Sequence, residues 1–546
     1  MVLWQLDTGR KQFLPHLSSP ICNIVVSECG KSYALKLADN CVVILSAREL
    51  QPLATITSLQ ISASIPRSAS QVARKGIPST KPTTAILHPQ RPEQLLVTVP
   101  VNHQLLPKGI TLVSAPVLQT YDLRSGGHIS RQALARTNAT TLNTGPDGTQ
   151  NLTPDIKQLC LSGDGKWMAT VDSWTPYPED VEALDIDCGG RHGLEEVYLK
   201  FWLWNESSSF WQLVTRVDSP HSLNHGSAAV LDLASRPSSH EFATLGSDGL
   251  LRLWRPVTKQ RHMLSKESEQ APETWKCRNT LDLRGYLGRY DSRLSPLRSA
   301  SACFSEDGSV LAVSLQSTSA TPGLAILVDV QSCSARNSQV GVYSGEICTT
   351  AFLNCHLLVA TRQAVFIWDT VNDSVKTVAT EGNGPCLLAV NPRTRTFATA
   401  SRHSHQKSIS KKIRKRGFPV RIYDIDSLAV LSHFKLAKEP VNLLSNPNCA
   451  EYVVVDAVAN VQQIGSTSKI SQFNNADTLV RYSDIGLEGL FGRHSSSSIN
   501  KPETATGSDA LLDERDGLAG IFGNTPPFAL PSSHVVFQDL VKALSI

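Results

Sequence analysis

The sequence lacks the features of several broad protein classes. Its 546 residues contain no run that approaches the ~18 uninterrupted apolar residues of a membrane-spanning helix. Charged residues make up only 18% of the chain, the formal net charge is +4, and 41% of the residues are apolar. This balance excludes a disordered chain, a coiled coil and a basic peptide that wraps nucleic acid.

Motifs for catalysis and for metal or nucleotide binding are also missing. The 12 cysteines are scattered, without a Cys-x-x-Cys pair or histidines at zinc-finger spacing. Gly30-Lys31-Ser32 resembles the end of a phosphate-binding loop, but Val25 stands where that loop requires glycine. No Gly-x-Ser-x-Gly elbow, His-Glu-x-x-His motif or dinucleotide fingerprint is present. We therefore expect no enzyme, no cofactor and no metal site, with reduced cysteine thiols packed in the core.

A repeat of three apolar, strand-like runs is present instead. In the clearest copy, residues 230–235 and 241–246 lead through Asp248-Gly249 into Leu250-Leu-Arg-Leu-Trp254. The alternation in the last run has the period of two of a strand, and the glycine suits a tight hairpin. Further copies lie at 159–204, 302–329, 350–369 and 387–424, with weaker ones at 21–45, 85–122 and 441–464.

This repeat predicts an all-β protein with the architecture of a β-propeller. Consecutive hairpin-linked strands that end in an aromatic residue, often before Asp, resemble the WD-repeat pattern, in which four-stranded blades pack radially. The usual Gly-His dipeptide is missing, and the Trp-Asp pair survives cleanly only at Trp368-Asp369. An all-β sandwich is the alternative, but it would not repeat the same strand order. About eight units predict seven or eight blades.

The repeat divides the chain into three regions. Residues 1–15 resemble the end of a blade whose earlier strands are absent, residues 16–470 form the expected propeller, and residues 471–546 form a largely irregular tail. We expect the chain to be the later part of a longer protein with another propeller upstream. The alternative is that the C-terminal region supplies the missing strands, although no good matching strands follow Ile470.

Four insertions interrupt the repeat, at residues 57–82, 136–154, 174–196 and 403–416. The third is acidic and the fourth is strongly basic. A dense basic run is typical of a nuclear-import signal or of contact with a phosphate backbone, and a solvated loop is the alternative. Without interleaved aromatic residues, base stacking is not expected. The candidate residues for RNA binding or nuclear import are Lys407, Lys411, Lys412, Arg414, Lys415 and Arg416.

The tail contains short apolar motifs within a polar sequence. Gly486–Gly492 and Gly517–Gly523 are nearly identical, and residues 535–544 have the periodicity of a terminal amphipathic helix. Such motifs are typical of peptides that dock into a groove of a partner, and folding back onto the propeller is the alternative. The candidate partner-docking residues are Leu487, Leu490, Phe491, Leu518, Ile521, Phe522, Phe537, Leu540, Val541 and Leu544.

Two N-terminal segments carry a resemblance to a known family. Val2–Leu17, followed by Tyr33–Asn40, resembles the middle of proteins of the WD repeat-containing protein 75 family, which includes fungal counterparts. Leu281–Tyr286 and the basic insertion fit this family loosely. The resemblance covers most of residues 1–470 in repeat order, and its specific part is the first 60 or so residues. It implies tandem propellers, of which this would be the second, and a C-terminal extension.

The resemblance implies a non-catalytic scaffold subunit of the UtpA (t-UTP) subcomplex of the small-subunit processome, in the nucleolus. Such a subunit would bind sister WD-repeat subunits, and would contact the backbone of pre-rRNA in its 5′ external transcribed spacer. It would support early rRNA processing, with rDNA transcription as a further role. No membrane and no small-molecule substrate is expected. The alternatives are a WD-repeat adaptor of another complex (a ubiquitin-ligase substrate receptor or a trafficking coat) and an enzyme with a site in the central channel.

Overall fold

The computed structural model describes most of the chain between residues 84 and 465 and shorter segments outside it. The described ranges are 2–4, 9, 11–13, 21–27, 29–37, 41–48, 50–56, 59, 84–99, 102–105, 111–114, 117–134, 155–174, 196–223, 226–258, 273–287, 297–316, 322–380, 384–401, 417–457, 459–465, 471–472 and 480–481.

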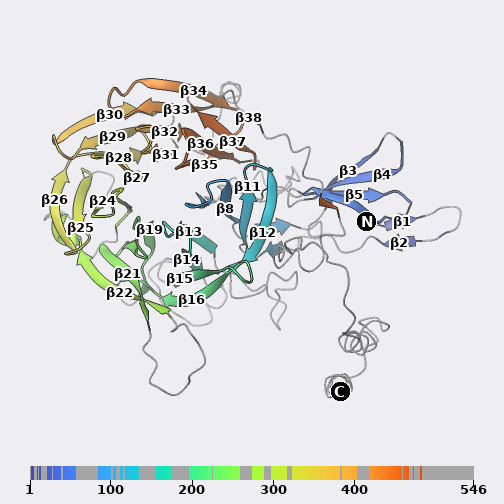
Figure 1. The fold of residues 1–546 in the computed structure, drawn as a ribbon, viewed down its shortest axis with the longest axis horizontal. Coiled ribbons are helices and arrows are strands. Elements are labelled where there is room, and N and C mark those ends of the chain that lie inside the picture. Colours follow the sequence, from blue (N-terminus) through green and yellow to red (C-terminus); the bar gives the residue numbers. More distant parts are fainter. Residues whose placement is uncertain are drawn as a thin grey trace, which may run out of the picture. The chain divides into compact units, whose positions relative to one another are not determined.

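Within these ranges, seven four-stranded antiparallel sheets are arranged around one axis as a β-propeller (Figure 1). We number them as blades 1 to 7 in chain order, and the strands of each blade as first (inner) to fourth (outer). Blade 1 comprises β7(Ala85–Leu87), β8(Gln94–Val99), β11(Val117–Asp122) and β12(Gly127–Ala133), and blade 2 comprises β13(Asp155–Leu161), β14(Trp167–Trp174), β15(Glu196–Asn205) and β16(Phe210–Asp218). Blade 3 comprises β19(Val230–Ser235), β20(Phe242–Gly246), β21(Leu250–Thr258) and β22(Glu273–Asp282), and blade 4 comprises β23(Ser299–Phe304), β24(Val310–Gln316), β25(Leu324–Asp329) and β26(Ser334–Val340). Blade 5 comprises β27(Ile347–Leu353), β28(His356–Thr361), β29(Ala364–Asp369) and β30(Ser374–Ala379), blade 6 comprises β31(Cys386–Asn391), β32(Thr396–Ser401), β33(Phe418–Asp424) and β34(Val430–Leu436), and blade 7 comprises β35(Pro440–Ser445), β36(Glu451–Asp456), β37(Val461–Gly465) and β38(Ser471–Gln472).

The remaining elements form smaller sheets and one short helix. A separate five-stranded sheet has the order β3-β4-β5-β6-β39, and three two-stranded sheets pair β1 with β2, β9 with β10, and β17 with β18. These elements are β1(Val2–Trp4), β2(Lys11–Phe13), β3(Ile21–Val26), β4(Ser32–Leu37), β5(Val42–Ser46), β6(Pro52–Ile56), β9(Asn102–Leu105), β10(Thr111–Ser114), β17(Ser222–Leu223), β18(Gly226–Ser227), β39(Val480–Arg481) and the 3₁₀ helix η3(Arg284–Tyr286).

The ring closes between the last blade and the first. The first strands of neighbouring blades contact one another in sequence order, and β35 of blade 7 contacts β7 of blade 1. One buried cluster joins Leu95 and Val97 of blade 1 to Val453 and Val455 of blade 7. Burial of each such side chain stabilises the fold by about 1.5–3 kcal/mol, so this seam holds together segments more than 300 residues apart in the sequence.

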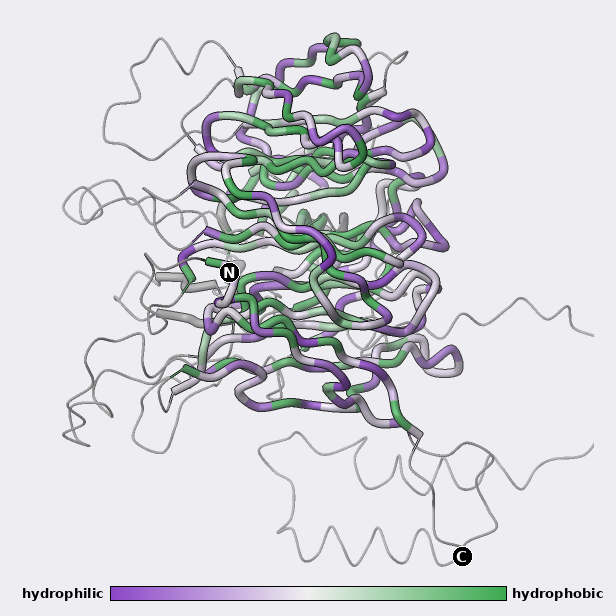
Figure 2. Tube along the Cα trace, turned by 90° about the vertical axis from the view of Figure 1, so that its left-hand side faces the viewer, coloured by the Kyte–Doolittle hydropathy of each residue, from purple (hydrophilic) through white to green (hydrophobic). Residues whose placement is uncertain are grey.

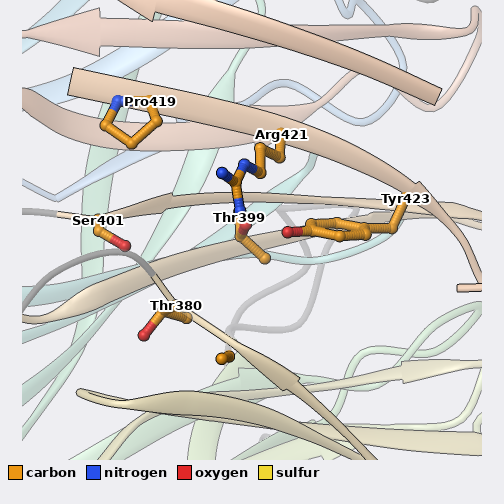
Figure 3. Close-up of a pocket in the computed structure, with 7 residues that line it drawn as sticks. Thr380, Thr399, Ser401, Pro419, Arg421 and Tyr423 are labelled. Carbon is orange, nitrogen blue, oxygen red and sulfur yellow. The ribbon is translucent and has the colours of Figure 1, made fainter. Parts of the chain in front are cut away.

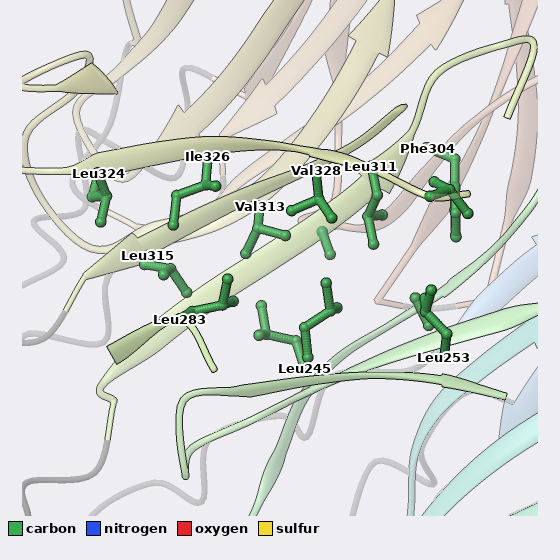
Figure 4. Close-up of a cluster of buried hydrophobic side chains, with 14 of the residues drawn as sticks. Leu245, Leu253, Leu283, Phe304, Leu311, Val313, Leu315, Leu324, Ile326 and Val328 are labelled. Carbon is green, nitrogen blue, oxygen red and sulfur yellow. The ribbon is translucent and has the colours of Figure 1, made fainter. Parts of the chain in front are cut away.

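The seams between blades form the hydrophobic core. Between blades 3 and 4, for example, Leu245 and Leu253 of one blade pack against Leu311, Val313 and Ile326 of the other (Figure 4). The second and third strands are buried because they have a neighbouring blade on both sides, whereas outer strands such as β30 are mostly exposed. Figure 2 shows the resulting pattern, with hydrophobic residues concentrated along strands and hydrophilic residues in many turns.

Hydrogen bonds join four buried polar side chains in the seam between blades 2 and 3. His221 lies just before β17, and its two ring nitrogens are 3.0 Å from Asp248 Oδ1 and 2.9 Å from Thr244 Oγ1. Trp254 Nε1 donates to the same Thr244 oxygen at 2.8 Å. A Cβ at Gly246 would lie 2.2 Å from the His221 ring, so this close approach requires glycine. The usual Gly-His dipeptide does not mark His221, because Pro220 takes the place of the glycine before it.

The prediction of an all-β propeller is confirmed, and the ring has seven blades. The weak copy at residues 21–45 is not an eighth blade of this ring: it supplies β3, β4 and β5 of the separate five-stranded sheet. Two short strands follow Ile470: β38 completes blade 7, and β39 pairs with β6 of the separate sheet. The three domain boundaries themselves remain predictions.

The burial of the cysteines agrees only in part with the expectation that their thiols are packed in the core. All ten cysteines whose side chains the structure describes are free. Three of them are buried, namely Cys41, Cys160 and Cys386, while Cys29 and Cys277 are exposed. Among the described residues, no helix has the length and apolar character needed to cross a membrane.

Candidate nucleic-acid interface

The order of the strands determines the face of the ring from which three of the insertions leave. Because the four strands of a blade are antiparallel, connections from the second to the third strand share a face with connections from one blade to the next. The acidic segment between β14 and β15 and the basic segment between β32 and β33 both connect the second strand of a blade to its third strand. Residues 135–154, between β12 and β13, connect blade 1 to blade 2. We call this side of the propeller the insertion face.

The basic insertion is anchored on two rigid strands of blade 6. All six residues of β32 are buried, and Ala398 and Ala400 pair with Ile422 and Val420 of β33. These four side chains pack in the seam with blade 7. The segment 402–416 therefore starts at a fixed residue, Ser401, and returns at Gly417, whose φ of +71° favours glycine.

A small polar hollow lies beside these anchors, in the seam between blades 5 and 6. It is shallow and partly open to solvent, with room for only about one water-sized group, and we call it the blade 5/6 hollow. Figure 3 shows the Arg421 guanidinium and the Tyr423 hydroxyl directed toward Thr399. The residues that line it are Ala379, Thr380, Thr399, Ser401, Pro419, Arg421 and Tyr423.

The chemistry of the hollow is that of hydrogen-bond donors. Arg421 is half-buried and carries a permanent positive charge, while Thr399, Ser401 and Tyr423 are buried and contribute hydroxyl groups. The Thr380 hydroxyl donates to the carbonyl oxygen of Arg362 at 3.2 Å, which fixes its position. Among the described residues that line the hollow, none carries a carboxylate.

The aromatic ring in the hollow is already engaged by the protein. The Tyr423 ring stacks on Phe397 with a centroid separation of 5.0 Å and an interplanar angle of 13°. Both residues belong to the apolar cluster between blades 5 and 6. The hollow can therefore offer the edge and the hydroxyl of Tyr423 to a ligand, but the ring is not free to sandwich a base.

The site residues predicted from the sequence lie outside the described residues. This holds for the six basic residues of the insertion, Lys407, Lys411, Lys412, Arg414, Lys415 and Arg416. It holds equally for the tail residues Leu487, Leu490, Phe491, Leu518, Ile521, Phe522, Phe537, Leu540, Val541 and Leu544. The roles given to both sets remain predictions, and the structure contributes the anchors of the insertion and the surface next to them.

Sequence reasoning missed the blade 5/6 hollow. Arg421 lies in the run Val420-Arg-Ile-Tyr-Asp424 of the repeat copy at 387–424, for which the repeat predicts a strand and nothing more. The feature of the sequence that points to the hollow is the alternation within this run: Val420 and Ile422 face blade 7, while Arg421 and Tyr423 face blade 5. A basic residue on the inward-facing side of a buried strand is unusual, and it marks a place worth testing.

One mixed cluster has the donor types of a metal site. Cys355 Sγ lies 3.6 Å from His356 Nδ1, and His356 Nε2 lies 3.9 Å from Asp369 Oδ2. The hydrogen bond from the Asn372 side chain, together with those from the backbone of Asn372 and Val371, holds the pKa of Asp369 below its usual range. The Asp369 carboxylate thus fixes the turn that follows β29.

Comparison with known proteins identifies relatives across the whole chain. Residues 151–322, which include β13 to β24, match the family model described as the WD repeat-containing protein 75 second beta-propeller. The U3 small nucleolar RNA-associated protein 17 of Schizosaccharomyces pombe is 26% identical over 99% of this chain. The chain is homologous to these proteins.

Two further relatives support this homology. The WD repeat-containing protein 75 of Xenopus laevis is 25% identical over 58% of this chain, and the NET1-associated nuclear protein 1 of Saccharomyces cerevisiae is 24% identical over 46%. The chain spans 61% of the length of the Schizosaccharomyces pombe relative and 30% of the length of each of the other two.

Proposed function

We propose that this chain is a non-catalytic scaffold subunit of the small-subunit processome that binds pre-rRNA and sister WD-repeat proteins in the nucleolus. The observation that carries the proposal is the homology over 99% of the chain to a protein named for its association with the U3 small nucleolar RNA. In this role the chain supports early rRNA processing in the UtpA subcomplex, with rDNA transcription as a further role.

The geometry suits a binding platform. Blades with buried seams hold the ring rigid, and the insertions leave from one face of it. The basic insertion between Ser401 and Gly417 supplies positive charge for the phosphates of the 5′ external transcribed spacer. Several weak contacts on one rigid body gain from effective concentration, so no single contact needs to be strong.

The RNA part of the proposal is tested by removing the charge of the insertion. Lys411, Lys412, Arg414, Lys415 and Arg416 are replaced together by Gln, and binding to structured RNA is measured by fluorescence anisotropy between 50 and 200 mM salt. Each lost phosphate contact should reduce the slope of log K against log salt by about 0.7–0.9. An unchanged slope, together with unchanged nuclear import of a tagged copy, would mean that the insertion is only a solvated loop.

The partner part of the proposal concerns the tail motifs. We propose that the apolar islands around Phe491 and Phe522 and the helix-like segment 535–544 dock on neighbouring subunits. Truncation after Arg481 keeps β38 and β39, so the melting temperature should stay within about 3 °C of that of the full chain. Pull-downs followed by mass spectrometry should then lose specific WD-repeat subunits. A drop of ten degrees or more would instead place the tail in the core.

A nucleolar signal of a tagged copy distinguishes this proposal from its main alternative. An adaptor of a ubiquitin ligase or a trafficking coat would localise elsewhere and would co-purify with other machinery. Co-purification of U3 small nucleolar RNA and pre-rRNA would support the processome, and their absence from a nucleolar sample would contradict it.

A further inference from the structure

The inference concerns Cys355, His356 and Asp369, which we call the blade 5 cluster, and it goes beyond the function proposed above. We propose that this cluster binds one zinc ion through the thiolate of Cys355, one ring nitrogen of His356 and the carboxylate of Asp369. Three observations carry this step: the distances between the donor atoms, the hydrogen bonds that hold the cluster in place, and a comparison with the same positions in other blades.

The first observation is the geometry of the three donor groups. Cys355 Sγ lies 3.6 Å from His356 Nδ1, and one donor atom from each of the three residues lies within 4.8 Å of the other two. In a tetrahedral site, zinc bonds of about 2.0–2.3 Å place the ligand atoms about 3.4–3.6 Å apart. The distances between the donor atoms therefore need to close by about 1.4 Å at most, which rotation of the side chains can supply.

The donor types select the class of metal. Thiolate and imidazole ligands are typical of zinc, whereas magnesium and calcium prefer oxygen ligands alone. The thiolate, which forms when the thiol proton is released on binding, and the carboxylate together balance the two charges of the ion. Cys355 is partly buried, and the side chains of His356 and Asp369 are 15% and 17% exposed, so the ion can enter and keep a water molecule as its fourth ligand.

The second observation is that hydrogen bonds hold the cluster in place. His356 and Asp369 lie directly opposite each other on β28 and β29. The backbone N–H and the hydroxyl of Thr370 donate to the carbonyl oxygen of Cys355, at 3.0 and 2.8 Å, so the turn that carries Cys355 is tied to the residue after Asp369. The Asp369 carboxylate also accepts a hydrogen bond from the Asn372 side chain at 2.7 Å. Hydrogen bonds of this kind orient the carboxylates that bind metals and leave lone pairs for the ion.

The third observation comes from other blades with the same turn. In blades 1, 4, 5 and 6, an aspartate ends the third strand and accepts a hydrogen bond from a backbone N–H of the following turn. The residue opposite this aspartate is glutamine in blade 1, valine in blade 4 and threonine in blade 6, but histidine in blade 5. The residue before it is glutamate, serine and arginine in those blades, but cysteine in blade 5. The turn thus forms without a histidine or a cysteine beside it, and the fold does not account for either residue in blade 5.

The surroundings of Asp369 also differ from those of its counterpart in blade 4. There Asp329 pairs with Arg336, which neutralises its charge. Among the described residues, the ion-pair partner of Asp369 is His356, with 3.9 Å between Nε2 and Oδ2. This distance is too long for a direct hydrogen bond, so a metal ion does not have to displace one there. The sequence gave no sign of the site, because Cys355-His356 and Asp369 do not have the spacing of a zinc motif.

The comparison between blades also supplies variants that the ring already tolerates. Cys355→Ser places in blade 5 the serine that blade 4 has at this position, and His356→Gln places there the glutamine of blade 1. Asp369→Asn keeps a side-chain oxygen that can accept the hydrogen bonds of the turn, but it removes the negative charge. Cys333→Ser is the matched control, because it removes another partly buried thiol, in a turn of blade 4.

The test uses the full chain, reduced and freed of metal by a chelator, and two probes. Co²⁺ should produce a thiolate-to-metal absorption band that Zn²⁺ abolishes by displacing cobalt and that Mg²⁺ leaves unchanged. Zn²⁺ should raise the melting temperature of the unmodified chain and of Cys333→Ser. Cys355→Ser should lose the cobalt band, and zinc affinity should fall at least about 10-fold in Cys355→Ser, His356→Gln and Asp369→Asn.

A cobalt band that persists in Cys355→Ser would place the metal at other thiols and overturn the proposal. Equal zinc affinity in the unmodified chain and in both His356→Gln and Asp369→Asn would overturn it as well, as would a melting temperature that zinc leaves unchanged. The metal-free melting temperatures show whether each variant folds, and they should lie within about 3 °C of that of the unmodified chain. If Cys355→Ser does not fold, the zinc affinities of the other two variants decide. RNA binding takes no part in these measurements, so their result is independent of the proposed function.

Discussion

Blades 4 and 6 turn the same strand pair toward the preceding blade, but they fill it with different chemistry. Blade 4 offers Val313 and Ile326, which are fully buried among leucines in the seam with blade 3 (Figure 4). Blade 6 offers Thr399 and Arg421 at the same register. The same backbone thus accommodates an apolar pair in one seam and a polar, charged pair in another. Exchanging residues between such positions tests this comparison directly.

The largest effect should come from placing the cation of blade 6 in blade 4. In Ile326→Arg, a guanidinium would be buried in a seam without a polar partner among the described residues, which we expect to destabilise the fold by about 4–5 kcal/mol or to prevent folding. Urea denaturation measures the loss. The matched control is Ser338→Arg, on the exposed outer strand directly opposite, which should change the unfolding free energy by less than about 0.5 kcal/mol. Similar losses in both variants would contradict a special role of the seam.

The next effect concerns blade 2, where the cation is neutralised internally. In Lys200→Met, Asp172 keeps its buried carboxylate but loses the ammonium group that pairs with it, and we expect a loss of about 3–5 kcal/mol. The double variant Lys200→Met with Asp172→Leu removes both charges and should recover most of this loss. A double variant as unstable as the single one would show that the pair itself, rather than the charge left behind, stabilises the seam.

A smaller effect is expected from the four-residue chain in blade 3. In His221→Ala, Asp248 and Thr244 each lose a buried hydrogen-bond partner, which should destabilise the fold by about 2–3 kcal/mol at neutral pH. Burial alone would raise the pKa of Asp248, but the hydrogen bond and charge of His221 outweigh burial and hold this pKa below its usual range.

The pH dependence of that loss has a defined sign. A carboxyl group whose pKa is lower in the folded state stabilises the fold above its unfolded pKa, and this contribution disappears as the pH falls through the folded pKa. The difference in stability between the unmodified chain and His221→Ala should therefore be full above about pH 4 and shrink below it. Urea denaturation at a series of pH values measures this, and a constant difference would mean that the Asp248 charge takes no part.

The sequence predicts the strands whose apolar residues alternate or run continuously, and it does not predict the strands that lack both patterns. The first three strands of each clear repeat copy belong to the first group. The fourth strands, such as β30, are exposed along almost their whole length and leave no hydrophobic period to read. Ring closure was beyond local patterns as well, because it depends on contacts between β7 and β35, which are distant in sequence.

The candidate site was predicted only in its sequence-local part. The run from Lys411 to Arg416 is visible because its charges are contiguous. The blade 5/6 hollow combines residues of β32 and β33 with Thr380 from the end of blade 5, and no spacing in the sequence relates these segments. His221 shows the same limit, since its partners Thr244 and Asp248 lie 23 and 27 residues away.

The smallest effect on stability, and the most informative, should come from the reverse exchange in blade 6. In the double variant Thr399→Val with Arg421→Ile, blade 6 carries the valine and isoleucine that blade 4 has at the same register. Because apolar side chains of similar volume replace a threonine and a half-buried cation, we expect the unfolding free energy to stay within about 1 kcal/mol or to rise slightly.

That result would show that the fold does not need the polar pair of blade 6. A large loss of stability in the double variant would contradict this, because the Thr399–Arg421 pair would then belong to the structural core. The single variant Thr399→Val separates the contributions of the two residues: it removes one hydroxyl and leaves the cation in place, so the unfolding free energy should change by less than about 1 kcal/mol.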